Sequence, residues 1–185
     1  MTRAAVSTPT VRVWDRAVRV LHWALVGAVA LAALTLLVWF GAHQPAGYAA
    51  LAIVALRALW GGVGSHYARL RQFVRAPRAT LRYARAVAHG REPRYLGHNP
   101  LGGWMIVALM ACITGLALTG WLYMTDAFWG DELVERVHRA LAWTLLGLVV
   151  LHVGGVLFTS LRQHENLVRA MLDGRKRAPS KDDIA

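Results

Sequence analysis

Long apolar segments without charge constrain this chain more than any other feature of its sequence. No Asp, Glu, Lys or Arg occurs in residues 20–56, 95–125 or 140–161. A helix of about 20 apolar residues crosses the roughly 30 Å hydrocarbon core of a bilayer, and the first segment is long enough for two such helices joined by a short turn. We therefore predict one membrane domain over residues 1–185, an all-α bundle of four transmembrane helices near 18–40, 44–65, 100–123 and 132–160.

The distribution of charge predicts how these helices are oriented. The chain has 21 Lys and Arg against 10 Asp and Glu, a formal net charge of +11 at pH 7. Its basic residues gather before the first span, in the loop 66–98 and in the tail 161–185, whereas the loop at 126–135 is acidic. Because cytoplasmic loops carry the excess of Lys and Arg, we expect both termini and the basic loop in the cytoplasm. Basic residues that flank spans do not indicate nucleic-acid binding.

Four histidines lie in or beside the predicted spans. His138 and His152 are 14 residues apart on the fourth span, so both rings leave one face of the helix about 21 Å apart along its axis. His22 lies near the cytoplasmic end of the first span, and His43 begins the second span at the outer side. Depth therefore pairs His22 with His152 and His43 with His138.

Two imidazoles at each of two levels indicate a particular metal chemistry. Ionisable side chains inside hydrocarbon are costly, so each histidine is a functional candidate, although one alone could simply bond a neighbouring helix. Haem iron accepts two axial imidazoles, whereas zinc or copper would need three or four ligands at one point. The pattern predicts two haems b. With Cys112 as the single cysteine and no Cys-x-x-Cys-His motif, we expect non-covalent protohaem IX.

Two further polar residues are candidates for cofactor binding. Arg57 is a cation well inside a predicted span, 14 residues beyond His43 and so level with the inner pair. A buried guanidinium needs an anion such as a haem propionate or a group in a quinone site; otherwise it snorkels or makes a polar packing contact. His98, just before the third span, either belongs to a quinone or propionate site or serves only at the helix start.

The basic loop contains a run at 77–89 that predicts a helix with Arg78, Arg82 and Arg85 on one face. Contact with lipid headgroups is its simpler role, and a specific docking site is the alternative. Tryptophans near the predicted span ends indicate an interfacial aromatic belt, made of Trp23, Trp39, Trp104, Trp121 and Trp129.

A set of short motifs, taken in order, resembles the bacterial cytochrome b561 and nickel-iron hydrogenase b-type cytochrome superfamily. The motifs are Val13-Trp14-Asp15-Arg16, Leu21-His22-Trp23, His43-Gln44-Pro45-Ala46-Gly47-Tyr48, Arg57-Ala58-Leu59-Trp60-Gly61, Gly97-His98-Asn99-Pro100-Leu101-Gly102 and Glu165-Asn166-Leu167-Val168-Arg169-Ala170-Met171, together with His138 and His152. The resemblance covers nearly the whole chain. It implies a four-helix protein of the bacterial inner membrane that binds two b-type haems through His22, His43, His138 and His152 and exchanges electrons with quinone. The absence of a fifth span favours the shorter b561 type over the hydrogenase subunits.

The expected function is that of a di-haem membrane cytochrome with quinol or quinone oxidoreductase activity. It would move electrons between ubiquinone or another quinone and a redox partner. A haem-binding anchor subunit of a larger oxidoreductase complex is the alternative, and a haem-free transporter with histidine relays is a third. Besides membrane lipid, the partners considered are a periplasmic cytochrome c, an oxidoreductase subunit and a second copy of the chain in a homodimer.

Overall fold

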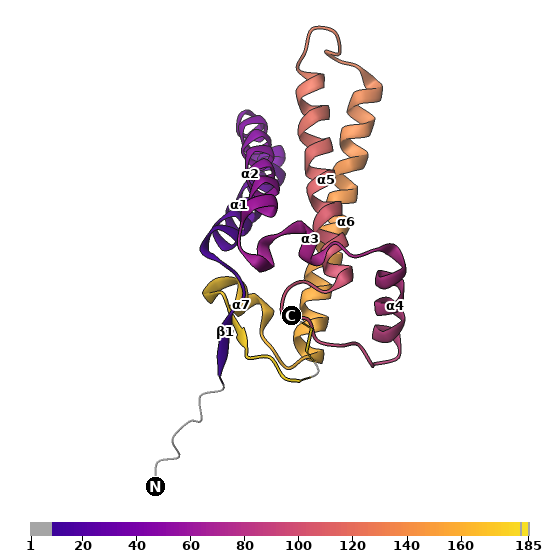
Figure 1. Cartoon of the computed structure of the whole chain (residues 1–185). Helices are drawn as coiled ribbons and strands as arrows, with labels where there is room; N and C mark the ends of the chain where they lie inside the picture. The colour runs from indigo at the N-terminus through magenta and orange to yellow at the C-terminus, as the bar shows by residue number, and fades with distance from the viewer. Residues whose placement is uncertain (1–8, 182, 185) are drawn as a thin grey trace.

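The computed structural model describes residues 9–181, 183 and 184, and four long helices dominate it (Figure 1). They are α1 (Arg16–Val38), α2 (His43–Val63), α5 (Pro100–Tyr123) and α6 (Glu132–Arg162). Each contains a segment long and apolar enough to cross a membrane, which confirms the expected all-α bundle with four membrane helices. The expected cytoplasmic termini include residues 1–8 and 185, which lie outside the described residues.

Side-chain caps mark the start of three of the four long helices, α1, α5 and α6. Asp15 accepts a hydrogen bond at 2.8 Å from an amide in the first turn of α1, which is why α1 starts two residues before the predicted span. The same carboxylate accepts hydrogen bonds from the Trp60 indole at 3.0 Å and from the Ser65 hydroxyl. It thereby ties the start of α1 to the end of α2. Asn99 and Asp131 cap α5 and α6 in the same way.

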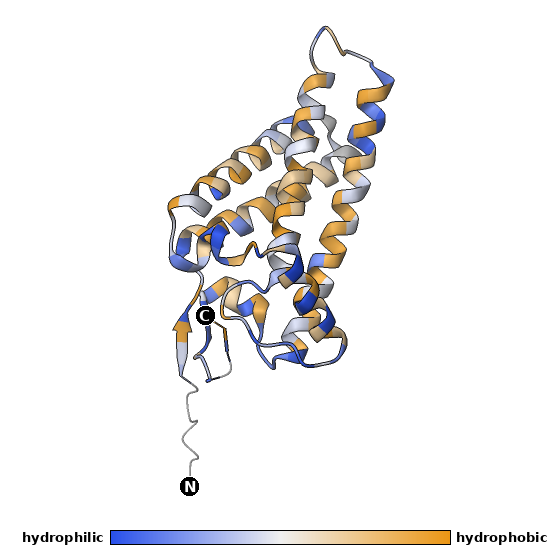
Figure 2. Ribbon diagram, turned by 45° about the vertical axis from the view of Figure 1, so that its right-hand side comes forward, coloured by the Kyte–Doolittle hydropathy of each residue, from blue (hydrophilic) through white to orange (hydrophobic). Residues whose placement is uncertain are grey.

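The four helices form two hairpins. α1 packs against α2, which follows it through the short helix η1 (Phe40–Ala42), and α5 packs against α6. α2 and α5 join the hairpins, while α1 and α6 pack against each other less closely within the described residues (Figure 1). A buried apolar cluster lies at the middle of the bundle and consists of Ala50, Val54, Cys112, Ile113 and Leu145. Figure 2 shows hydrophobic residues along the four long helices and hydrophilic residues gathered near their ends.

We call the end of the bundle at which α1 and α5 begin the basic end. The opposite end, which carries the loop before α6, is the acidic end. Several short elements close the basic end. The elements η2 (His66–Ala68), α3 (Leu70–Phe73) and α4 (Pro77–Ala88) connect α2 to α5, and α7 (Leu167–Asp173) follows α6. β1 (Thr10–Arg12) pairs antiparallel with β2 (Arg175–Arg177). α4 is the helix expected at 77–89, but neither the strand pair nor α7 was predicted, because hydropathy carries no signal for such short elements.

A buried ionic cluster holds the C-terminal segment on the basic end. Arg94 pairs with Glu165 at 2.9 Å and also with Asp183. Lys176 Nζ lies 3.8 Å from the Glu165 carboxylate and donates a hydrogen bond at 3.0 Å to the Leu96 carbonyl. The four charged side chains are only 4–8% exposed. Removing one member would leave a buried charge without its partner, so the cluster resists separation of the tail from the loop.

Acid is expected to detach the C-terminal segment before it disturbs the bundle. Burial opposes ionisation of Asp183, but hydrogen bonds from the Ser180 amide and from Arg94 outweigh burial and hold the pKa of this carboxyl below its ordinary value of 3.8. A lowered carboxyl pKa stabilises the folded state above the ordinary value, and this contribution is lost as the pH falls through the lowered value. Backbone amides of residues 174–184 should therefore lose protection from hydrogen exchange only in strong acid.

The matched variant Asp183→Asn should show this loss of protection already at neutral pH, while exchange in α5 stays unchanged in both proteins. Tail amides that remain as protected in acid as at neutral pH would show that the ionic cluster does not hold the segment.

Candidate functional site

The long helices bring four imidazoles together in two pairs. His22 of α1 and His152 of α6 have ring centroids 6.5 Å apart with planes inclined by 53°. His43 of α2 and His138 of α6 have ring centroids 6.2 Å apart with planes inclined by 75°. The first pair lies toward the basic end and the second toward the acidic end. The structure thus brings together the same two pairs of histidines that were expected from their depths along the predicted spans.

The separation within each pair suits one metal ion between two rings. An imidazole nitrogen binds a first-row metal at about 2 Å, so two nitrogens on opposite sides of the ion lie about 4 Å apart and the ring centroids about 6 Å apart. Among the described residues no group of three or more His, Cys, Asp or Glu side chains converges on one point. Each pair therefore supplies two donors, as axial ligation of a planar metal complex requires.

Hydrogen bonds orient both rings of the acidic-end pair. His43 Nδ1 lies 2.8 Å from the Ala32 carbonyl oxygen. A carbonyl only accepts, so Nδ1 carries the proton and Nε2 carries the lone pair that a metal needs. His138 Nδ1 lies 2.9 Å from the Thr119 hydroxyl, and this hydroxyl also lies 2.8 Å from the Gly115 carbonyl. Thr119 therefore donates its proton to Gly115 and accepts one from His138, which fixes the same tautomer there.

The basic-end pair lies beside the short elements that close the basic end, which together we call the cap. The Trp23 ring meets His22 edge to face, with centroids 5.2 Å apart, and its indole N–H donates a hydrogen bond at 3.2 Å to the Met171 carbonyl of α7. A Cβ placed on Gly155, three residues after His152, would meet nothing within 4 Å, so the surface of α6 is open at this position. The same holds for Gly47, one turn after His43.

Five side chains at the basic end contact one another in succession, in the order Lys176, Trp14, His98, Phe73 and Arg57, and we call this series the basic-end column. The Lys176 ammonium nitrogen lies 5.9 Å from the Trp14 ring centroid. The ring centroids of Trp14 and His98 are 4.5 Å apart, and those of His98 and Phe73 are 4.7 Å apart. The Arg57 guanidinium carbon lies 5.9 Å from the Phe73 ring centroid. This basic-end column connects a residue of the tail with the one arginine buried in α2.

Arg57 and His98 each present a buried polar atom without a hydrogen-bond partner among the described residues. Arg57 Nη2 donates a hydrogen bond to the Ala68 carbonyl at 3.1 Å. Arg57 Nη1 and His98 Nδ1 have no hydrogen-bond partner among the residues that the structure describes. Burial, followed by the positive charges of Arg57 and Lys176, lowers the pKa of His98 to about 3. The ring is therefore neutral at physiological pH. Unpartnered buried polar atoms are rare, so these two point toward a polar group that binds beside them.

Sequence reasoning did not identify Thr119, Phe73 or Lys176 as part of this arrangement. Thr119 had a usable signal, because a hydroxyl in a span as apolar as α5 must bond either its own helix or a neighbour. Phe73 and Lys176 had none, since both reach the column through short cap elements. Arg57 and His98, which the sequence suggested separately, prove to be members of one column.

The fold and the paired imidazoles are those of an integral membrane cytochrome. The chain matches the family of prokaryotic cytochromes b561 over residues 13–174, and it belongs to that family. It is also similar to a probable Ni/Fe-hydrogenase B-type cytochrome subunit from Bradyrhizobium diazoefficiens. These two sequences are 24% identical over 224 aligned positions, which cover 93% of this chain and 88% of the relative.

Membership of a b-type cytochrome family implies haem b as the cofactor and a prokaryotic membrane as the location. The residues present fit that cofactor on two counts. The imidazole pairs have the spacing that axial ligation needs, and the unpartnered nitrogen of Arg57 is of the type that pairs with a carboxylate such as a propionate. The matched range ends at residue 174, so Lys176 and Asp183 lie beyond it.

Close packing at Gly103 should be essential for the position of the Phe73 ring. A Cβ at residue 103 would lie 2.4 Å from the Phe73 carbonyl oxygen. Gly103→Ala must therefore push α3 away from α5, with an expected loss of about 1–3 kcal/mol in the free energy of unfolding. Thermal unfolding in detergent measures the effect. Gly62→Ala is the control, because a Cβ there meets nothing within 4 Å and alanine favours the helix. Equal stability of the two variants would contradict the packing argument.

Proposed function

We propose that this chain binds two non-covalent haems b and transfers electrons between the membrane quinone pool and a redox partner across the inner membrane. In this proposal His22 and His152 are the axial ligands of the basic-end haem, and His43 and His138 are those of the acidic-end haem. The observation that carries the proposal is the spacing of the two imidazole pairs, 6.5 and 6.2 Å between ring centroids.

The side chains of this protein would hold the haems and tune them. Two axial imidazoles fill the coordination sphere of the iron, which suits electron transfer rather than oxygen binding. Bound haem supplies reversible one-electron chemistry. The hydrogen bonds from His43 to Ala32 and from His138 to Thr119 would keep Nε2 directed at the metal and raise its basicity. The central apolar cluster would keep water out of the space between the two levels.

Arg57 and His98 are the residues proposed to bind anionic or quinone oxygens at the basic end. The unpartnered Arg57 Nη1 would pair with a haem propionate, and the neutral His98 ring would donate one hydrogen bond from Nδ1 to a propionate or to a quinone carbonyl. A neutral ring is suited to hydrogen bonding with quinone, because it adds no charge to a buried site.

The partner and the membrane orientation complete the proposal. The excess of Lys and Arg supports a cytoplasmic position for the basic end, which would leave the acidic end for a periplasmic cytochrome c or an oxidoreductase subunit. The name of the Bradyrhizobium relative favours one alternative, a membrane subunit that anchors a larger oxidoreductase. An assay of quinone reduction or quinol oxidation by the purified chain separates the two functions, because only the first requires turnover without a partner. A homodimer is compatible with both.

Loss of one axial ligand should remove one haem and spare the other. His22→Ala is expected to lower the haem content from two per chain to one, with the acidic-end spectrum retained, and His43→Ala should have the opposite effect because it breaks the other pair. Extracted haem is measured against protein, and the two spectral components are followed in reduced-minus-oxidised spectra.

His164→Ala is the matched control, because His164 lies in the turn after α6 and should leave both haems in place. If either ligand variant folds but loses both haems, the assignment of the pairs is wrong. Wild-type protein without haem would overturn the proposal itself.

Replacement of Arg57 should shift the potential of one haem only. Arg57→Leu removes a positive charge beside the basic-end haem, which favours the oxidised iron and lowers its midpoint potential. The acidic-end haem, about 21 Å away along α6, should barely respond. Arg57→Lys should give an intermediate value, because it keeps the charge and loses the planar fork. Potentiometric titration checks this, and an unchanged potential with both haems bound would assign Arg57 to packing or to quinone binding instead.

A further inference from the structure

α4 turns a basic face away from the rest of the protein. Arg78, Arg82 and Arg85 are exposed and recur at spacings of four and three residues, and Leu81, 53% exposed, lies among them. These four side chains line a shallow hollow on the helix surface. Tyr83 faces the opposite way, is buried, and meets the Tyr95 ring edge to face with centroids 5.5 Å apart. The buried tyrosine therefore fixes the rotation of α4, so that the arginines point outward.

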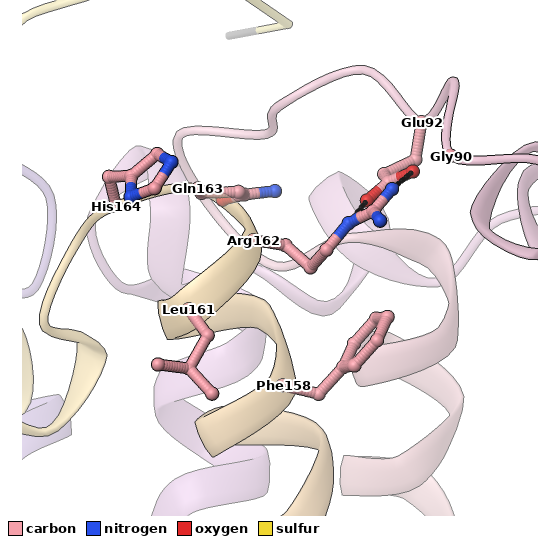
Figure 3. A pocket seen from close by; sticks show the side chains of 7 residues that line it. All are labelled: Gly90, Glu92, Phe158, Leu161, Arg162, Gln163 and His164. Carbon is pink, nitrogen blue, oxygen red and sulfur yellow. Dashed lines mark hydrogen bonds and ion pairs between the residues drawn. The ribbon is translucent and has the colours of Figure 1, made fainter.

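The contacts of α4 place this face where the long helices leave the hydrocarbon. Just before α4, the Arg75 carbonyl accepts a hydrogen bond at 3.0 Å from the indole of Trp104, in the second turn of α5. Just after α4, Glu92 pairs at 3.0 Å with Arg162, the last residue of α6. Figure 3 shows this pair beside the apolar side chains of Phe158 and Leu161 on the same helix. Exposed apolar residues next to paired charges mark the depth of lipid headgroups.

Within the described residues, Arg78, Arg82 and Arg85 form no ion pair. Residues 66–91 contain no Asp or Glu. The first acidic residue after α4 is Glu92, and its carboxylate is engaged by Arg162, whose hydrogen bond lowers the pKa of Glu92. Among the residues that the structure describes, the three arginines and Leu81 therefore present an unpaired cationic and apolar surface.

We propose that the exposed face of α4 binds the phosphate of an anionic phospholipid headgroup. Arg78, Arg82 and Arg85 would donate hydrogen bonds to the phosphate oxygens, and Leu81 would contact the glycerol and upper acyl region. Guanidinium groups match phosphate geometrically, and each basic residue near an anionic membrane surface adds attraction. The site holds α4, and through Tyr83 and Tyr95 the loop before α5, against the membrane surface. It does not depend on which cofactors or electron partners the bundle serves.

Competition between spin-labelled lipids tests the site in the full-length, haem-loaded chain reconstituted in phosphatidylcholine bilayers. Electron paramagnetic resonance measures how strongly spin-labelled phosphatidylglycerol, relative to spin-labelled phosphatidylcholine, is immobilised by the protein. The wild type should prefer phosphatidylglycerol. In the triple variant Arg78→Gln, Arg82→Gln, Arg85→Gln this preference should fall at least about fivefold, the effect of one basic residue near an anionic surface.

Two comparisons isolate the α4 face from general electrostatics. Arg136→Gln with Arg139→Gln removes exposed arginines from the acidic end and should leave the preference intact. Leu81→Ser should weaken it with all charges kept. Equal preference in the wild type and the triple variant would overturn the proposal, and so would an equal loss in the acidic-end variant. If added inorganic phosphate abolishes the wild-type preference, the site binds free phosphate instead of a lipid headgroup, and the proposal is wrong.

Discussion

Hydrocarbon offers no hydrogen-bond partner, so each polar side chain within the four long helices has to find one inside the protein. The Thr35 and Thr119 hydroxyls bond carbonyls of their own helices at 2.8 Å, and Arg57 bonds the Ala68 carbonyl at 3.1 Å. The hydrogen bonds that polar side chains need also determine how the helices are oriented. His43 reaches the Ala32 carbonyl only when the α1–α2 hairpin has its observed register, and His138 reaches Thr119 only when α5 and α6 present matching faces.

The two ends of the bundle are built differently. The acidic end is closed by short connections alone, whereas the basic end has a folded cap with its own apolar core and a buried ionic cluster. Through the basic-end column, the cap connects the C-terminal tail to the region beside the basic-end imidazole pair. The tail members of these contacts, Lys176 and Asp183, lie beyond the range that matches the family. The environment of His98 therefore combines residues within the matched range with a lysine outside it.

The sequence was sufficient for the membrane helices because hydropathy and charge are summed over about 20 residues in each span. It was also sufficient for the partners within the histidine pairs, since helical rise converts sequence separation into depth. It was not sufficient for the cap. β1 and β2 have three residues each and are far apart in the chain, and Arg94, Glu165 and Asp183 meet only after all the helices are placed. The role of Thr119 was not predicted, because it depends on which residue of α6 faces it.

The looser packing between α1 and α6 has a consequence for how the protein is assembled. Each hairpin closes on its own, and the hairpins meet mainly through α2 and α5. The helices that carry His22 and His152 are therefore packed less closely against each other than the helices within each hairpin. Under the proposed ligation, a planar hydrophobic cofactor dissolved in the bilayer would enter the bundle laterally, between α1 and α6, after the helices have been inserted into the membrane.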